Sequence, residues 1–260
     1  MIYCFSGTGN TRHVAELLSS RLLMRVHEFT PGELRVPEEA VLSSDDKVII
    51  WAFPTYSWGV PPVVSRIIRK AQLNFPEDAT HIAVTTCGDD VGNLSSMFRK
   101  LLKYRKKNVG AVFSVQMPNT YVMMKGFDTD AENIARDKIQ AAVNKVDDIA
   151  RAIESGKVLV ADSDVVRGKF GWIKTQIIYP YFVRFEMSPR GFNVNTDKCI
   201  SCGRCVKSCP MRNIALDVDR HPQWGSQCAF CTACYHVCPT HAVGWKKTTA
   251  SKGQARYFNK

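Results

Sequence analysis

The feature that most constrains the fold is a repeated cysteine pattern in the last quarter of the chain. It reads Cys199-x-x-Cys202-x-x-Cys205-x-x-x-Cys209-Pro210. Eighteen positions after Pro210 it begins again as Cys228-x-x-Cys231-x-x-Cys234-x-x-x-Cys238-Pro239. Eight of the ten cysteines lie in these two stretches, and their spacing is identical. We therefore treat the stretch as an internal repeat whose two halves bind the same kind of group.

The spacing within each half indicates iron–sulfur chemistry. Three cysteines at this spacing wrap a short turn around three corners of a cube, and the fourth, followed by proline, reaches the other cube. A structural zinc site would use paired Cys-x-x-Cys units with a longer gap, and a disulfide framework belongs to small secreted chains. We also find no secretory signal. The expected [4Fe–4S] ligand sets are Cys199, Cys202, Cys205 with Cys238, and Cys228, Cys231, Cys234 with Cys209.

Residues 192–246, with the lead-in Asp197-Lys198-Cys199, resemble the bacterial two-cluster ferredoxin family. The resemblance implies a small α+β ferredoxin-like domain with two [4Fe–4S] clusters. His236 lies inside the second motif, where a surface position is the default and a hydrogen bond that tunes the cluster is the alternative. We expect the basic tail, residues 247–260, to be exposed and partly disordered.

The other end of the chain carries a polar loop between an expected strand, residues 1–6, and a helix. The loop reads Ser6-Gly7-Thr8-Gly9-Asn10-Thr11. Backbone N–H groups, hydroxyls and the positive end of a helix dipole together suit a phosphate. The loop lacks the lysine of a nucleoside-triphosphate P-loop and the Gly-x-Gly-x-x-Gly pattern. An ordinary strand-to-helix turn remains the alternative.

With this sequence and its position near the N-terminus, the loop resembles the phosphate loop of flavodoxins. The resemblance implies that FMN is the cofactor. The pattern that follows alternates strands with helices, which predicts a doubly wound, five-stranded parallel sheet over residues 1–155. Its ligand would lie beyond the carboxyl ends of the strands. The further strands are expected at 26–29, 47–53, 81–86 and 111–116, and the later helices at 62–71, 94–104 and 131–154, the last with Ile134, Ile139, Val143, Val146 and Ile153 inward.

Two loops after expected strands resemble the other flavin-binding loops of that family. In the first, Tyr56 or Trp58 is the candidate to stack on the flavin, and Gly59 the candidate for backbone contact near its reactive nitrogen; loop packing is the alternative for both aromatics. In the second, Gly88 would let backbone N–H groups reach the flavin. The proposed cofactor-binding residues here are Pro54, Thr55, Tyr56, Ser57, Trp58 and Gly59, and Thr86, Cys87, Gly88, Asp89, Gly92 and Asn93.

The second of these loops has no aromatic residue, although many flavodoxins place one there. One flavin face would then be open, or be covered by Tyr121 or Phe127. An open face suits contact with a substrate or with the ferredoxin-like domain. Cys87 is expected near the flavin and Cys4 inside a strand, neither with a catalytic role.

The joint between the domains, residues 156–191, fits neither family pattern. Phe170, Ile173, Ile177 and Tyr181 are at helical spacing and predict an interdomain packing face, with a membrane-surface helix as the alternative. The run Arg99–Lys107 contains six cations and no acid. It is either a solvated helix face or a docking patch for an acidic partner.

The net charge of +11 would fall to about +5 with two clusters and a flavin phosphate bound. This favours acidic redox partners such as a ferredoxin, a flavodoxin or a reductase. We find no nucleic-acid motif, no candidate membrane span and no catalytic set of side chains. We expect a cytoplasmic location, because thiolate ligands and oxygen-sensitive cubes suit a reducing compartment. A homodimer is possible.

The chain as a whole resembles flavodoxin–ferredoxin fusion proteins of anaerobes. The resemblance implies an electron-transfer protein that relays electrons between two [4Fe–4S] clusters and FMN, to or from redox partner proteins. The alternative is a reductase that receives ferredoxin-level electrons and reduces a small molecule at an exposed FMN face. The pattern leaves open whether the protein is an enzyme.

Overall fold

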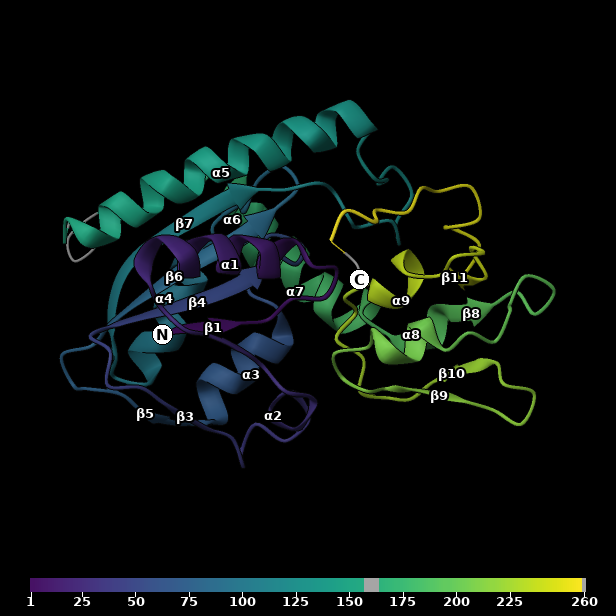
Figure 1. Ribbon diagram of the computed structural model, residues 1–260, viewed down its shortest axis with the longest axis horizontal. Helices are drawn as coiled ribbons and strands as arrows, with labels where there is room; N and C mark the ends of the chain where they lie inside the picture. The colour runs from purple at the N-terminus through teal and green to yellow at the C-terminus, as the bar shows by residue number, and fades with distance from the viewer. Residues whose placement is uncertain (157–163, 259–260) are drawn as a thin grey trace.

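The computed structural model describes residues 1–156 and 164–258, in which a larger α/β domain carries a smaller domain at one end of its sheet (Figure 1). The large sheet is parallel throughout and has the order β2-β1-β4-β6-β7. This is the flavodoxin-like order for a doubly wound sheet. It confirms the expected fold class. Its strands are β1 (Ile2–Cys4), β2 (Val26–Glu28), β4 (Val48–Pro54), β6 (Thr80–Cys87) and β7 (Asn108–Gln116).

Short elements fill the connections of this domain. Two strands that the sequence did not predict, β3 (Val41–Ser43) and β5 (Gln72–Asn74), form a separate parallel pair. A five-residue helix, α2 (Pro31–Arg35), begins at a capping box made by Thr30 and Glu33.

Helices cover both faces of the sheet because side chains on each strand alternate between two apolar cores. Tyr3 and Phe5 face the core under α3 and α4, whereas Ile2 and Cys4 face the core under α1 and α5. The helices are α1 (Asn10–Leu22), α3 (Pro62–Lys70), α4 (Leu94–Tyr104) and α5 (Glu132–Glu154). The inward face of α5 is formed by Ala135, Ala142, Val146, Ile149 and Ala150. The expectation for Ile134 was wrong, since its side chain is 44% exposed.

The small domain shows the sequence repeat in its backbone. Each half places a four-residue helix after its second cysteine, α8 (Arg204–Lys207) and α9 (Ala233–His236). Left-handed φ values recur at equivalent positions: 53° and 57° at Ser201 and Phe230, 69° and 63° at Gly203 and Thr232. Two antiparallel pairs flank the helices, β8 (Phe192–Val194) with β11 (Val243–Trp245), and β9 (Ile214–Leu216) with β10 (Pro222–Trp224).

The joint forms the expected helix, but with the opposite face inward. Helical turns α6 (Gly171–Ile173) and α7 (Tyr179–Tyr181) alternate with π-helical turns at Lys174–Ile178 and Phe182–Glu186. The buried side chains are Thr175, Tyr179 and Phe182. Hydrogen bonds fix this face, since Thr175 Oγ1 donates to Trp58 O at 2.7 Å and Tyr179 Oη donates to Val60 O at 2.5 Å. The predicted packing face is therefore wrong, because those two bonds turn it outward.

The described part of the tail, residues 247–258, is packed against both domains, contrary to the expectation of an exposed segment. Ala255 is 4% exposed, and Gln254 Nε2 donates to the carbonyls of Tyr235 and Cys238 at 2.6 and 3.0 Å. The Phe258 ring stacks on His13 with centroids 4.3 Å apart. Residues 253–258, which we call the C-terminal strap, thus run from the small domain back to α1. No helix within residues 1–156 and 164–258 has the length and apolarity to cross a bilayer.

One core histidine makes the stability of the large domain depend on pH. His81 on β6 is fully buried, and its Nδ1 accepts a hydrogen bond from Trp51 Nε1 at 3.0 Å. Burial, and then the charge of Lys107, lower the pKa of His81 to about 4. The unfolded chain therefore binds a proton near pH 6.5 that the native chain does not bind.

We predict that the free energy of unfolding falls as the pH falls from 6.5 toward 4, by up to ~1.4 kcal/mol per pH unit from this residue. His81→Gln keeps an acceptor for Trp51 but does not titrate, so its pH dependence should be shallower. Urea unfolding followed by tryptophan fluorescence at several pH values measures both slopes. Identical slopes in the two proteins would contradict the prediction.

Candidate functional site

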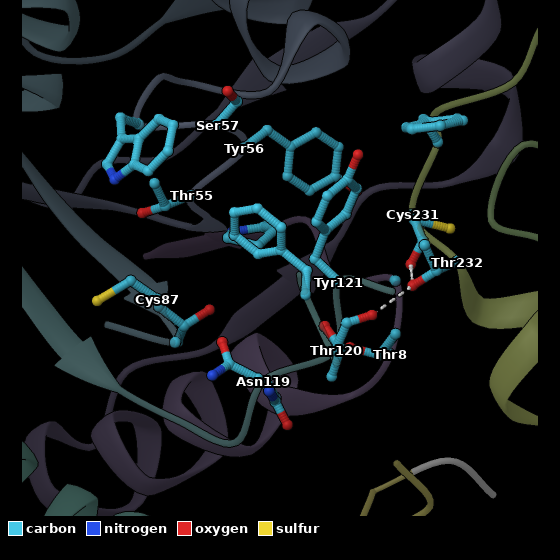
Figure 2. Close-up of a pocket in the computed structure, with 18 of the residues that line it drawn as sticks. Thr8, Thr55, Tyr56, Ser57, Cys87, Asn119, Thr120, Tyr121, Cys231 and Thr232 are labelled. Atoms are coloured by element: carbon cyan, nitrogen blue, oxygen red, sulfur yellow. Dashed lines mark hydrogen bonds between the residues drawn. The ribbon is translucent and has the colours of Figure 1, made fainter. Parts of the chain in front are cut away.

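A cavity of about 400 Å³ lies at the carboxyl ends of β1, β4 and β6, where the large domain meets the small one (Figure 2). All but four of the eighteen predicted cofactor-binding residues line it. They are Ser6, Gly7, Thr8, Asn10, Thr11, Pro54, Thr55, Tyr56, Ser57, Trp58, Thr86, Cys87, Gly88 and Asp89. Three loops far apart in sequence are brought together because parallel strands end at one edge of the sheet.

The first loop forms the N-terminus of α1. Ser6 Oγ accepts from the Arg12 N–H at 3.2 Å, and the hydroxyls of Thr11 and Thr86 lie 2.8 Å apart. Asn10 Nδ2 donates to Pro118 O at 2.9 Å, which ties the loop to the segment after β7. No acidic residue lies in the first turn of α1. Free N–H groups at a helix N-terminus without a nearby carboxylate fit a phosphate.

The second loop is a tight, strained turn. Tyr56 and Gly59 exchange both backbone hydrogen bonds, at 3.0 and 2.9 Å. Between them, Ser57 and Trp58 have φ values of 43° and 64°. Left-handed φ values raise the conformational free energy of residues that have a Cβ. They persist where contacts with neighbouring residues stabilise them. Here Nζ of Lys174 lies over the Trp58 ring, 4.9 Å from its centroid. The joint helix therefore stabilises the turn whose residues Tyr56 and Trp58 line the cavity.

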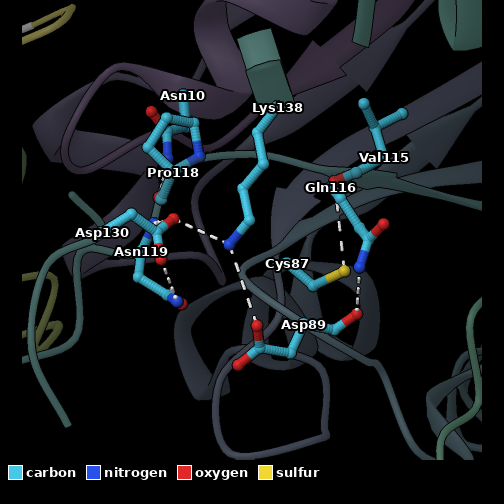
Figure 3. Close-up of polar contacts among 9 residues, drawn as sticks. All are labelled: Asn10, Cys87, Asp89, Val115, Gln116, Pro118, Asn119, Asp130 and Lys138. Carbon is cyan, nitrogen blue, oxygen red and sulfur yellow. Dashed lines mark hydrogen bonds and ion pairs between the residues drawn. The ribbon is translucent and has the colours of Figure 1, made fainter. Parts of the chain in front are cut away.

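The third loop is held in place by a polar network (Figure 3). Asp130 accepts from the Asn119 N–H and from Asn119 Nδ2, both at 2.9 Å, and from Lys138 Nζ at 2.7 Å. Lys138 also lies 3.8 Å from Asp89. A Cβ on Gly88 would overlap the Asn119 carboxamide, so glycine is required for this close approach. Burial raises the pKa of Cys87 to about 12, so its thiol is uncharged.

Four predicted contact residues lie outside the cavity lining because neighbouring segments cover them. Gly9 packs on Phe258 of the C-terminal strap, and Gly59 packs on the Tyr179 ring. Gly92 donates its N–H to Asp90, and Asn93 donates its N–H to Thr175 of the joint helix at 2.8 Å. These four residues therefore contact neighbouring segments and stabilise the conformation of the loops.

Several lining residues were not found by sequence reasoning. Tyr121 and Phe127, the two candidates for covering the flavin, do line the cavity and meet edge to face at 5.6 Å. Asp90 follows β6, and Cys231 belongs to the cysteine repeat. The others come from the segment after β7, the joint helix and the small domain, where no motif marks them. They are Pro118, Asn119, Thr120, Met124, Ile178, Tyr181, Phe182, Glu186, Phe230 and Thr232.

The first expected ligand set gathers around one small cavity. Cys199, Cys202 and Cys205 line it together with Cys238 from the other half of the repeat. Cys202 is exposed, whereas Cys205 and Cys238 are buried. The chain therefore brings the remote fourth cysteine to the first three, as the crossed pairing requires.

The second set gathers on the side facing the large domain. Burial, and to a lesser degree the charge of Cys209, raise the pKa of Cys228 to about 11. Burial likewise raises the pKa of Cys231 to about 12, with further contributions from Cys228 and Cys209. Because a metal binds the thiolate, loading this set would release protons.

Backbone N–H groups point at equivalent sulfurs in the two halves. Asn213 N donates to Cys209 Sγ at 3.3 Å, and Ala242 N donates to Cys238 Sγ at 3.2 Å. Although burial acts in the opposite direction, hydrogen bonds of this kind hold the pKa of Cys238 below its usual value. Donors to cluster sulfurs are one means by which a protein sets a reduction potential.

The two domains meet where the second set adjoins the loop at the N-terminus of α1. A Cβ on Gly7 would overlap Cys231 Cβ and lie 3.1 Å from Cys231 Sγ. Burial, and then the charges of Cys231 and Cys228, raise the pKa of Tyr56. Tyr56 and Cys231 therefore lie close together, and Figure 2 shows both at the cavity. Cys231 belongs to the lining of the cavity and to the expected ligand set alike.

Hydrogen bonds of two further residues, Thr232 and His236, stabilise this junction. Thr232, at a left-handed position where the first half has Gly203, donates through Oγ1 to Thr120 O at 3.2 Å and to Cys231 O at 2.7 Å. His236 is fully buried rather than at the surface, which corrects the default expectation. Its Nε2 bonds Thr120 O at 2.7 Å, and its Nδ1 accepts from the Ala255 N–H at 3.0 Å. These bonds join α9, the large domain and the C-terminal strap.

We predict that Gly7→Ala destabilises the protein by ~1–3 kcal/mol, because the new methyl group must displace Cys231 in a packed interface. Gly32→Ala is the matched control, since its Cβ would meet only Thr30 Oγ1 at 3.8 Å. Thermal unfolding of the two variants and the parent measures the difference. Equal midpoints for Gly7→Ala and the parent would show that the two domains do not meet here.

Comparison with known proteins gives a family match in the small domain and similar solved structures for the rest of the chain. Residues 192–239 match the 4Fe-4S dicluster domain family. No curated protein sequence matches the chain. Among solved structures, a Streptococcus pneumonia TIGR4 flavodoxin is similar at 17% identity, covering 60% of this chain and 95% of its own, with a TM-score of 0.36. A putative flavoprotein from Bacteroides eggerthii DSM 20697 is similar at 16% identity, covering 54% and 95%, with a TM-score of 0.35.

These structural scores are low, and the strand order of the sheet carries the assignment of the larger domain. The small domain is assigned by its family match and its repeated backbone. The chain joins a flavodoxin-like domain to a 4Fe-4S dicluster domain, as its resemblance to flavodoxin–ferredoxin fusion proteins implies.

Proposed function

We propose that the protein is an electron-transfer iron–sulfur flavoprotein with one FMN and two [4Fe–4S] clusters. One observation carries the proposal: Cys231 lines the cavity built by the three flavin-type loops and packs on Gly7 of the phosphate loop. Flavin and cluster can then exchange electrons within one chain. A flavin accepts one or two electrons and each cluster passes one, so their combination can join single-electron and paired-electron chemistry.

The proposed order of centres follows from burial. Cys202 of the first set is exposed, whereas the second set faces the large domain. The first cluster is then the entry or exit point for electrons, and the second connects it to the flavin. The second ligand set and the three loops proposed to bind the flavin meet at one cavity of the same chain. Electron transfer between them therefore does not require a second subunit.

The surface around the entry point favours an acidic redox protein as the partner. Lys198, Arg204 and Lys207 are exposed and surround Cys202 in sequence. The cations of the run 99–107 are less suited to this role. Arg105 bonds the carbonyls of Ile68 and Ala71 at 2.8 and 3.1 Å, and the run lies at the opposite edge of the sheet from the cavity. We also propose a reducing compartment such as the cytoplasm, because none of the ten cysteines is paired.

The test uses anaerobically purified protein, for which we expect about eight irons and one FMN per chain. Cys202→Ala should reduce the iron to about four per chain, leave the FMN content unchanged and prevent rapid flavin reduction by a reduced ferredoxin. Cys4→Ala, which removes a buried thiol outside the repeat, should behave like the parent. Zinc in place of iron, absence of flavin, or unchanged flavin reduction in Cys202→Ala would contradict the proposed relay.

A second candidate function, a small-molecule reductase, is favoured by one acidic side chain. Glu186 of the joint helix lines the cavity, and its charge contributes after burial to raising the pKa of Tyr121. A carboxyl beside the covering aromatic residue could deliver a proton to a bound acceptor.

For a reductase we expect saturable turnover of a small acceptor without a protein acceptor. Glu186→Gln should then lower kcat by ~10²-fold with unchanged FMN content. Reoxidation by protein acceptors alone, equally fast in the variant, would leave electron transfer as the function. Steady-state kinetics with both kinds of acceptor separates the two.

A further inference from the structure

The outward face of the joint helix is the largest cluster of exposed apolar side chains on the described part of the chain. Its members are Phe170, Trp172, Ile173, Ile177, Tyr181 and Phe185, which are 74, 62, 43, 55, 58 and 59% exposed. We call these residues the aromatic face. Isolated apolar residues are common on protein surfaces, but a contiguous patch of this kind indicates an interaction site.

Charge distinguishes among the surfaces that could cover the aromatic face. Residues 165–190 contain five cations and one acid, Glu186, which is turned toward the flavin cavity. Lys174 is paired with Asp90 at 2.7 Å. Arg167, Lys169, Arg184 and Arg190 are exposed. The aromatic face is therefore bordered by positive charge and contains no carboxylate of its own.

This charge disfavours a second copy of the chain as the occupant. A symmetric dimer through this face would place the same cations opposite one another. It favours an anionic surface. Large aromatic and branched side chains along one side of a helix, with Lys and Arg beside them, are the pattern of a helix that lies in a membrane interface. Trp and Tyr are the residues that prefer the headgroup level of a bilayer.

We propose that the aromatic face binds the surface of an anionic lipid bilayer and holds the protein there peripherally. The arrangement has a consequence for the cavity. Ile178 and Tyr181 line the cavity and are also 40% and 58% exposed. Binding of the helix to lipid therefore brings this side of the cavity next to the headgroups. The proposal is independent of the electron-transfer role, because lipid binding needs only the exposed side chains.

The test measures co-sedimentation of the intact protein with vesicles made of equal parts of phosphatidylcholine and phosphatidylglycerol. We expect binding to these vesicles and much weaker binding to phosphatidylcholine alone. The substitutions Trp172→Ser and Phe185→Ser together should lower the partition coefficient at least about tenfold, since both side chains are exposed and their loss removes apolar contact with the bilayer. Arg167→Glu with Lys169→Glu should lower it to a similar extent.

Matched controls lie on α4, where Tyr104 is 75% exposed beside the exposed cations Lys100 and Lys103. Tyr104→Ser, and Lys100→Glu with Lys103→Glu, should leave binding within about twofold. Failure of the parent protein to bind anionic vesicles would overturn the proposal, and so would an equal loss in the α4 controls. A concentration-dependent dimer that Trp172→Ser with Phe185→Ser abolishes would assign the face to a second copy and would also overturn it.

Discussion

The architecture depends on one close approach, that of Cys231 to Gly7 in the loop before α1. There is no room for a Cβ at Gly7, so the second half of the cysteine repeat lies directly against the start of α1. A flavodoxin-like sheet leaves its ligand site open beyond the strand ends. Here the small domain occupies one side of that opening. The cavity between the two domains follows from this placement.

Three segments make the approach rigid. The segment after β7 contributes Val122 and Met123 to an apolar core that also contains Phe182 of the joint helix and Phe230 of the small domain. The C-terminal strap adds the bond from Ala255 to His236. Because one core and one strap include parts of both domains, the junction is packed like a domain interior. A fixed junction of this kind keeps the ligand set of Cys231 beside the cavity.

One left-handed residue at this junction distinguishes the two halves of the repeat. Thr232 has a branched Cβ and a φ of 63°, at a position where the first half of the repeat has glycine. Its hydroxyl bonds Thr120 across the domain boundary. The first half of the repeat faces outward and keeps Gly203. The difference between two otherwise equivalent turns thus marks which half contacts the large domain.

The sequence alone determined the two-part fold, because its signals are local: cysteine spacing sets the small domain, and alternating strands and helices set the parallel sheet. It also indicated the three loops, since strand ends and their motifs are readable in order. It did not determine the burial of His236, the course of the strap or the face that the joint helix buries. These depend on tertiary contacts that no local pattern shows. Thr120 with His236 and Val60 with Tyr179, for example, are hydrogen-bonded more than one hundred positions apart. Helical spacing shows which side chains share a face, whereas only the packed structure decides what that face meets.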